Sequence, residues 1–238
     1  MTDTCQNDSG FFRLLLTSFR YPFQGNGLYL IGGGAVFFSV TDFVSAHANI
    51  MAIFIQIGIS GYLASYVKDV VRTSAMGEDV PPSWVDFSDW VEDIVVPAFQ
   101  FLLILVLAFG VMVYLQFRHP FQGHTQTVAV LISAAWGCVL LPILLLGVAM
   151  TDSALAMFNP IPLMRAIWLT LPDYFMTCLF CALMIGLSLG LNILLAYGDH
   201  IPILPSLVSW FFNLYLITTL MRSFGLLYRF NHDRLQWY

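Results

Sequence analysis

The chain has 238 residues, of which 59% are hydrophobic and only 10% charged, and its mean hydropathy is +0.80. A soluble domain carries about 25% charged residues, and one of this size would have to expose much of its apolar surface, so a soluble fold is excluded. The composition predicts an all-α, polytopic integral membrane protein. The net charge of −5 comes mainly from one acidic stretch and there is no basic stripe, so we expect no nucleic-acid partner.

Residues 1–24 form the lead-in to the membrane domain. Residues 1–9 are polar and acidic, which predicts a flexible tail and not the basic start of a cleavable signal peptide. The segment 11–21 is too short to span a bilayer. At helical spacing Arg13, Thr17 and Arg20 share one face, opposite large apolar side chains, so we expect an interfacial amphipathic helix that Pro22 ends.

Six apolar segments are long enough to cross a bilayer, and they make residues 1–238 a single membrane domain. They cover about residues 28–44, 50–67, 98–117, 125–149, 174–197 and 205–227. Two of these segments carry small residues four apart, a spacing that lets helix backbones approach closely. The helix-packing candidates are Gly61, Ser65, Gly186 and Gly190.

Polar side chains within the spans are candidates for an intramembrane site, because an unpaired polar group in lipid is costly. Asp42 lies near the end of the first span, where it could cap the helix at the interface, make a buried hydrogen bond, or hold a proton or ion. Gln56 and Asn213 lie closer to mid-membrane. A transporter would need these two side chains around one hydrated cavity.

Residues 68–97 form an acidic connector between the second and third spans. The connector opens with a charged extension of the second helix, which the Pro81-Pro82 pair then breaks. In the helix expected next, the acidic face consists of Asp86, Asp89 and Asp93, and the apolar anchors are Trp84 and Phe87. We predict a second interfacial helix, held at headgroup level by its aromatic rings, before a third span that begins after Pro97.

A third short amphipathic helix is expected over residues 161–171. Asn159 can cap it, with Pro160 at the first helical position. The helix carries Arg165 and the aromatic anchor Trp168, and Pro172 should end it. It is too short to span, so it should lie at the interface or re-enter the membrane.

The cysteines and histidines do not indicate a metal or redox centre. Cys178 and Cys181 form a CxxC motif within a continuous apolar run, where a thiolate would be desolvated, so packing is favoured over chemistry. His119 and His124 share a loop that offers no carboxylate or cysteine ligand, which favours solvated side chains. We therefore expect no cofactor, no metal and no catalytic residue.

The distribution of cations predicts the orientation. Six spans place both termini on the same side, and of the nine Lys and Arg residues all except Arg118 fall on that side. The positive-inside rule then makes the termini, the connector and the tail 228–238 cytoplasmic. Removing one span would place the last three arginines outside, so six spans fit best.

Parts of the connector and the tail carry a family likeness. The residues concerned are Gly61, Tyr62, Gly77, Glu78, Asp79, Pro82, Trp84, Asp86 and Asp89, followed by Arg229, Arg234 and Trp237. In these positions the chain resembles an uncharacterised group of prokaryotic multi-spanning membrane proteins, a domain of unknown function that is distantly Yip1-like. The resemblance implies the inner membrane of a prokaryote and, by analogy, membrane organisation or partner binding.

Three classes of function are open. A non-enzymatic membrane scaffold or partner-binding subunit fits best, with a protein or a second copy as partner in the lipid bilayer. The contact face would comprise Asp86, Asp89, Asp93, Arg229 and Arg234, unless these charges pair within the chain and only orient the loop. The alternative is a small-solute or ion transporter with a mid-membrane site. A membrane enzyme or a divalent-cation site on the acidic face is the third class.

Overall fold

The computed structural model describes residues 4–47, 51–84, 91–118, 123–153, 158–196 and 203–235. Within these ranges the chain is helical and contains no strand. The helices and helical turns are α1 (Thr4–Thr17), η1 (Tyr21–Phe23), α2 (Gly27–His47), α3 (Met51–Met76), η2 (Val91–Val95), α4 (Val96–Arg118), α5 (His124–Thr151), α6 (Pro160–Leu169), α7 (Leu171–Ala196), α8 (Ile203–Phe230) and α9 (His232–Leu235). Six of them are long and apolar enough to cross a membrane, which confirms the all-α, multi-pass prediction.

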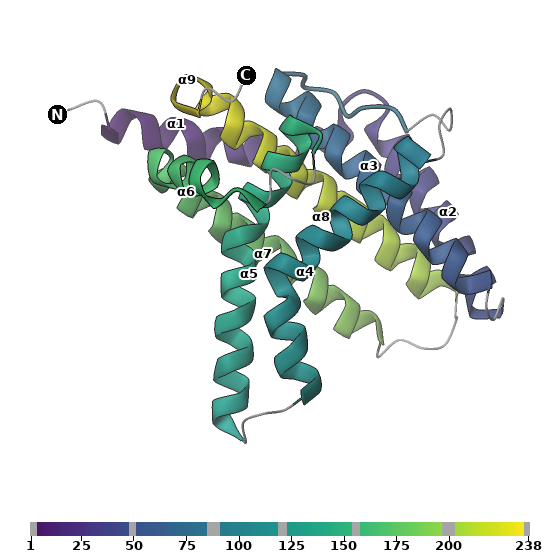
Figure 1. Cartoon of the computed structure of the whole chain (residues 1–238). Helices are drawn as coiled ribbons and strands as arrows, with labels where there is room; N and C mark the ends of the chain where they lie inside the picture. Colours follow the sequence, from purple (N-terminus) through teal and green to yellow (C-terminus); the bar gives the residue numbers. More distant parts are fainter. Residues whose placement is uncertain are drawn as a thin grey trace.

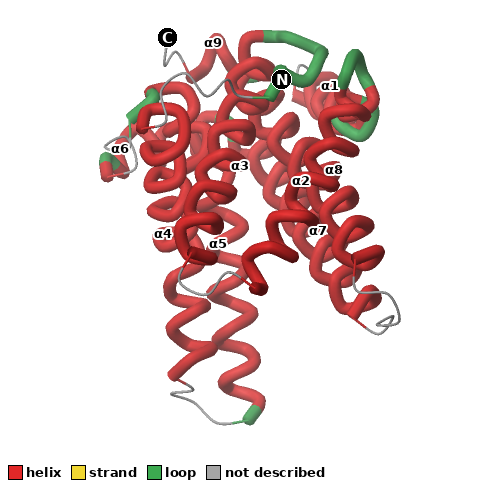
Figure 2. Tube along the Cα trace, turned by 90° about the vertical axis from the view of Figure 1, so that its right-hand side faces the viewer, coloured by secondary structure: helices red, strands yellow, loops and turns green. Residues whose placement is uncertain are grey.

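The long helices run between two unlike ends. Figure 1 shows α1, α6 and α9 together at one end, which also carries the segment that follows α3. We call this the connector end. The α4–α5 hairpin reaches furthest toward the opposite end, here called the far end, and extends beyond the other helices in both views (Figures 1 and 2).

Helix α8 is the central helix of the bundle. It contacts α2, α3, α5 and α7, and also α1 and α9 near its end. Its residues are buried without interruption from Thr218 to Tyr228, as expected for a helix surrounded by others. The main core joins its Phe224 and Leu227 to Val70 of α3 and Leu144 of α5.

Gly225 allows a close backbone approach between α8 and α3. A Cβ atom added there would collide with the Cβ atom of Ser74 and the carbonyl oxygen of Val71, both on α3. The missing side chain therefore lets α3 and α8 pack backbone to backbone, as small residues do in membrane helix pairs.

The third span begins earlier than the sequence indicates. Helical structure already starts at Val91, with a π-turn over Val91–Val95 that continues directly into α4. Pro97 was expected to precede the span but lies inside this continuous helix. Because proline has no N–H group for the helical ladder, the π-turn immediately before it accommodates the break in hydrogen bonding.

The short helices differ in part from the prediction. α1 begins at Thr4, so the flexible tail expected over residues 1–9 is wrong for residues 4–9. Part of the apolar side of α1 packs on protein, since Phe11 is buried with its ring centroid 5.3 Å from that of Phe230, whereas Phe12 is exposed. α6 ends at Leu169, and Pro172 lies in the first turn of α7 instead of ending α6. The interfacial position of α1 and α6 stays a prediction.

Candidate functional site

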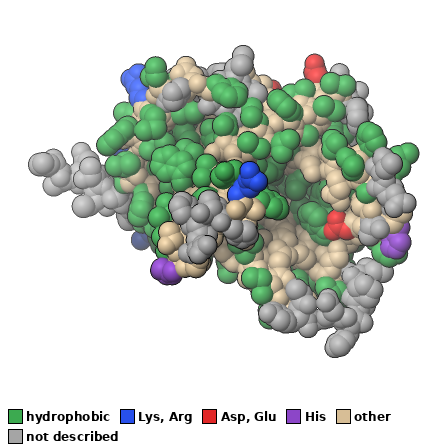
Figure 3. Space-filling view, turned by 60° about the horizontal axis from the view of Figure 1, so that its bottom comes forward, with side chains coloured by type: hydrophobic (Ala, Val, Ile, Leu, Met, Phe, Trp, Pro, Cys, Tyr) green, Lys and Arg blue, Asp and Glu red, His purple; other side chains and the backbone are tan. Residues whose placement is uncertain are grey.

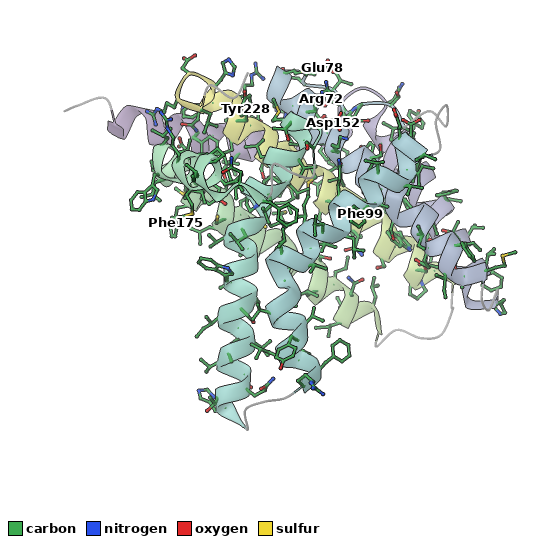
Figure 4. The ribbon with its side chains drawn as sticks, viewed as in Figure 1. Arg72, Glu78, Phe99, Asp152, Phe175 and Tyr228 are labelled. Atoms are coloured by element: carbon green, nitrogen blue, oxygen red, sulfur yellow. The ribbon has the colours of Figure 1, made fainter. Side chains whose placement is uncertain are left out.

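The ion pairs found among the described residues lie at the connector end, whereas the far end is mainly apolar. Figure 3 shows the far end, where many hydrophobic side chains lie on the described surface and the few charged ones are scattered. Figure 4 places Arg72, Glu78 and Asp152 close together at the connector end, although they come from different segments. We therefore treat the connector end as the candidate site.

Arg222 is the centre of this site. Only 4% of its side chain is exposed, and its guanidinium donates hydrogen bonds to the carbonyl oxygen of Glu78 and to the Asp79 carboxylate. The same guanidinium lies 4.6 Å from the centroid of the Tyr21 ring, a cation–π contact. One side chain of α8 therefore holds both the start of the connector and the turn before α2.

Tyr21 also binds the connector directly, in addition to its contact with Arg222. Its hydroxyl donates a hydrogen bond to the carbonyl oxygen of Val80 at 3.3 Å. Burial raises the pKa of the Tyr21 phenol, and the nearby Arg222 charge only partly counters this effect. The neutral phenol is thus the form that fits the folded protein.

The turn after α3 depends on Gly77. This residue has a φ angle of 96°, a conformation that strains residues with a side chain. The Arg229 guanidinium lies over it, and a Cβ atom there would meet the guanidinium carbon at 3.3 Å, a tight contact. Arg229 also approaches the Asp79 carboxylate at 3.6 Å, so Asp79 is shared between two arginines of α8.

A second ion pair lies beside the first. Lys68 of α3 binds the carboxylate of Asp152, the residue that ends α5 in a left-handed conformation with φ 57°. Gln100 of α4 donates to the backbone carbonyl of Asp152 at 3.4 Å. These contacts join the ends of α3, α4 and α5 at the same level of the bundle.

Between the two ion pairs lies a pocket of about 620 Å³. The ionisable side chains of its wall are Arg72, Arg229, His232 and Asp152, from α3, α8, α9 and the residue after α5. Methionine, alanine, threonine and tyrosine residues complete the lining.

Trp84, expected as an interfacial anchor, has its ring packed in the bundle. Its indole ring stacks on Tyr62 at 5.1 Å and on Tyr66 at 4.9 Å, measured between ring centroids. It also lies against Gly34, where a Cβ atom would collide with it. Trp84 is therefore packed between α2 and α3. Trp168, the other described anchor candidate, is 72% exposed.

The acidic face is only partly within the described residues. Asp86, Phe87 and Asp89 lie outside them, and Asp93 is half-buried in the π-turn at the start of α4. The C-terminal candidate Arg234 contacts the Asn231 side chain at 3.5 Å. That amide in turn donates to buried Asp173 of α7 at 3.0 Å, a latch that the sequence analysis missed. The sequence signal for this contact is an acidic residue at the start of a span, where an unpaired carboxylate would be costly.

The intramembrane polar candidates do not meet in one place. Asp42 accepts a hydrogen bond from the indole N–H of Trp210, so its described role is that of a hydrogen-bonded structural group. Asn213 belongs to a network between α7 and α8 that includes Ser209 at 3.1 Å. Gln56 is exposed on α3, where it lines a groove with α4.

Two of the four helix-packing candidates are buried, and two face open space. Gly61 is buried where α3 meets the π-turn, and a Cβ atom there would strike the Ile94 carbonyl. Ser65, one turn further along, is also buried. Gly186 and Gly190 face open space, so the contact expected of them is not made within the described chain.

In the described ranges no cluster of three or more His, Cys, Asp or Glu side chains could hold a metal ion. Cys178 and Cys181 are free thiols buried in the main core. Comparison with protein families, curated proteins and solved structures yields no match.

Proposed function

We propose that this chain is a non-enzymatic scaffold or partner-binding subunit of a prokaryotic inner membrane, related to the Yip1-like group that its connector resembles. The observation that carries the proposal is the Arg222 centre. It holds the start of the connector, the turn before α2 and the end of α8 in one fixed arrangement. A protein partner, or a second copy of the chain, would meet a preformed polar surface, and preformed surfaces bind at lower entropic cost.

The proposed orientation places this surface in the cytoplasm. The helix order puts all Lys and Arg residues except Arg118 toward the connector end, in accordance with the positive-inside rule. Single cysteines introduced at Glu78 and at Gly123, in a background without the native cysteines, test the orientation in intact cells. A membrane-impermeant maleimide should label position 123 and leave position 78 unlabelled until the cells are opened.

The alternative, a small-solute or ion transporter, has one observation in its favour. Ser188 and Asn192 of α7 and Ser209 and Asn213 of α8 form a hydrogen-bonded polar network, with Ser209 donating to Asn192 at 2.6 Å. Gln56 lies on a different side of the bundle, against α4. This separation supports the scaffold over a single mid-membrane solute site.

Site-specific photocrosslinking tests the proposed function. A photoreactive amino acid at Glu78 should give a defined crosslinked product in cells, to another protein or to a second copy. The matched position is Phe117, which is 81% exposed at the end of α4 near the far end. The proposal fails if Glu78 gives no product, or if both positions give the same products, while purified protein in liposomes transports a solute.

A further inference from the structure

The contacts of Arg222 do not account for the pocket of about 620 Å³ at the connector end. Its volume falls within the roughly 300–1,000 Å³ typical of small-ligand sites. Four separate segments contribute to its wall, namely α3, the end of α5, α8 and α9. Because four segments form the wall, the shape of the pocket does not depend on a single loop.

The charges around this pocket favour an anion. Arg72 takes part in none of the ion pairs found among the described residues, and Arg229 has only a long 3.6 Å approach to Asp79. Asp79 is held more closely by Arg222, so Arg229 has unused donors. The one acid of the lining, Asp152, is already neutralised by Lys68.

The remaining lining explains which anion would fit. His232 adds a nitrogen donor or acceptor, whereas Met76 and Met150 add flexible apolar surface. The guanidinium is planar and offers paired N–H groups that match two phosphate oxygens. Two such groups next to methionine side chains suit a phosphate attached to an apolar body.

We propose that this pocket binds a phosphate-bearing anion, with the phosphate between Arg72 and Arg229. The same chemistry is offered by the headgroup of an anionic phospholipid and by a soluble phosphate ester. The inference goes beyond partner binding and does not depend on it, because the pocket lies within one chain.

Calorimetric titration of the full-length protein in a zwitterionic detergent tests the proposal. The probes are short-chain phosphatidic acid, glycerol 3-phosphate and short-chain phosphatidylcholine. Arg72→Gln should weaken binding of the anionic probe at least about tenfold, because it removes the charge-assisted hydrogen bonds from this guanidinium to the phosphate. Met76→Glu leaves both arginines in place but adds a negative charge at an exposed position of the lining, and should weaken binding in the same direction. Arg165→Gln is the matched control, since Arg165 is exposed on α6 and does not line the pocket.

The outcomes separate the two sources of phosphate. Tight binding of phosphatidic acid alone indicates a lipid headgroup, and comparable binding of glycerol 3-phosphate indicates a soluble ester. Either result supports the site if Arg72→Gln and Met76→Glu weaken it and Arg165→Gln does not. The proposal is overturned if neither phosphate probe binds more tightly than phosphatidylcholine, or if Arg165→Gln weakens binding as much as Arg72→Gln.

Discussion

The connector end and the far half of the α4–α5 hairpin are held together by different forces. At the connector end, Arg222 and Lys68 bind carboxylates across segments that are distant in sequence. In the hairpin, α4 and α5 pack mainly on each other, and large side chains such as Val106 and Phe117 point outward. The difference shows that an apolar hairpin needs only lipid and one neighbour, whereas the loops at the membrane edge need specific polar partners.

The largest loss should follow from removing the centre of the polar end. Arg222→Met keeps most of the side-chain volume but deletes the hydrogen bonds to Glu78 and Asp79 and the contact with Tyr21. We expect unfolding in mixed detergent micelles to become easier by about 3 kcal/mol.

The matched variant is Asp79→Asn, which removes one charge from a side chain that is 67% exposed. It should cost less than about 1 kcal/mol. Equal effects of the two variants would mean that the surface ion pair, and not the buried guanidinium, holds the connector.

The second prediction concerns the stacked rings of Trp84, Tyr62 and Tyr66. Trp84→Ala removes the stacking on Tyr62 and Tyr66 and should destabilise the protein by about 2–3 kcal/mol. Trp168→Ala, at an exposed position on α6, should change the stability by less than about 0.5 kcal/mol. Chemical denaturation followed by circular dichroism measures both. A loss of stability in Trp84→Ala as small as that in Trp168→Ala would contradict the packing role and would favour Trp84 as a membrane anchor.

The third prediction compares two glycines in the spans. Gly225→Ala should push α3 and α8 apart and cost about 1–3 kcal/mol, because the added methyl meets backbone atoms. Gly186→Ala meets nothing within 4 Å and should be neutral or stabilise α7 by up to about 1 kcal/mol. Thermal stability in detergent distinguishes them. A loss at Gly186 that depends on protein concentration would instead reveal contact with a second copy.

The smallest effect is expected at Tyr21. Since burial raises its pKa in the folded state, the folded protein keeps this proton at pH values where the unfolded chain, with a pKa near 10, has lost it. The contribution of the neutral phenol is therefore complete below about pH 10 and is lost as the pH rises further. Tyr21→Phe should cost about 0.5–1 kcal/mol at neutral pH and show less alkaline loss of stability than wild type. Parallel alkaline curves for both proteins would contradict this assignment.

Local patterns in the sequence predicted the outline of the fold. All six spans follow from runs of apolar residues, because hydrocarbon length is a property of the segment itself. The start of α6 follows from Asn159, whose side chain does accept from the Ile161 N–H, at 3.4 Å. The capping bond joins residues two apart, so no knowledge of the rest of the chain is needed.

The contacts of the candidate site could not be predicted in the same way. Trp84 has the composition of an interfacial anchor, and only the position of Gly34 and Tyr62 on neighbouring helices turns its ring inward. Arg222 was recognisable as a cation in an apolar span, but its partner Glu78 is 144 residues away. Hydropathy contains no information on which helices become neighbours, so such pairs appear only once the bundle has formed.

The position of Arg222 also determines when the connector can be completed during synthesis. Glu78 leaves the ribosome 144 residues before the arginine that binds its carbonyl oxygen. At roughly 5–20 residues per second, this corresponds to a delay of about 7–30 s. During that interval the first spans can already be inserted, but the segment after α3 still lacks its arginine. The contacts between Arg222 and the connector can therefore form only after the last span has been translated. A chain truncated before α8 would leave its connector accessible to proteases.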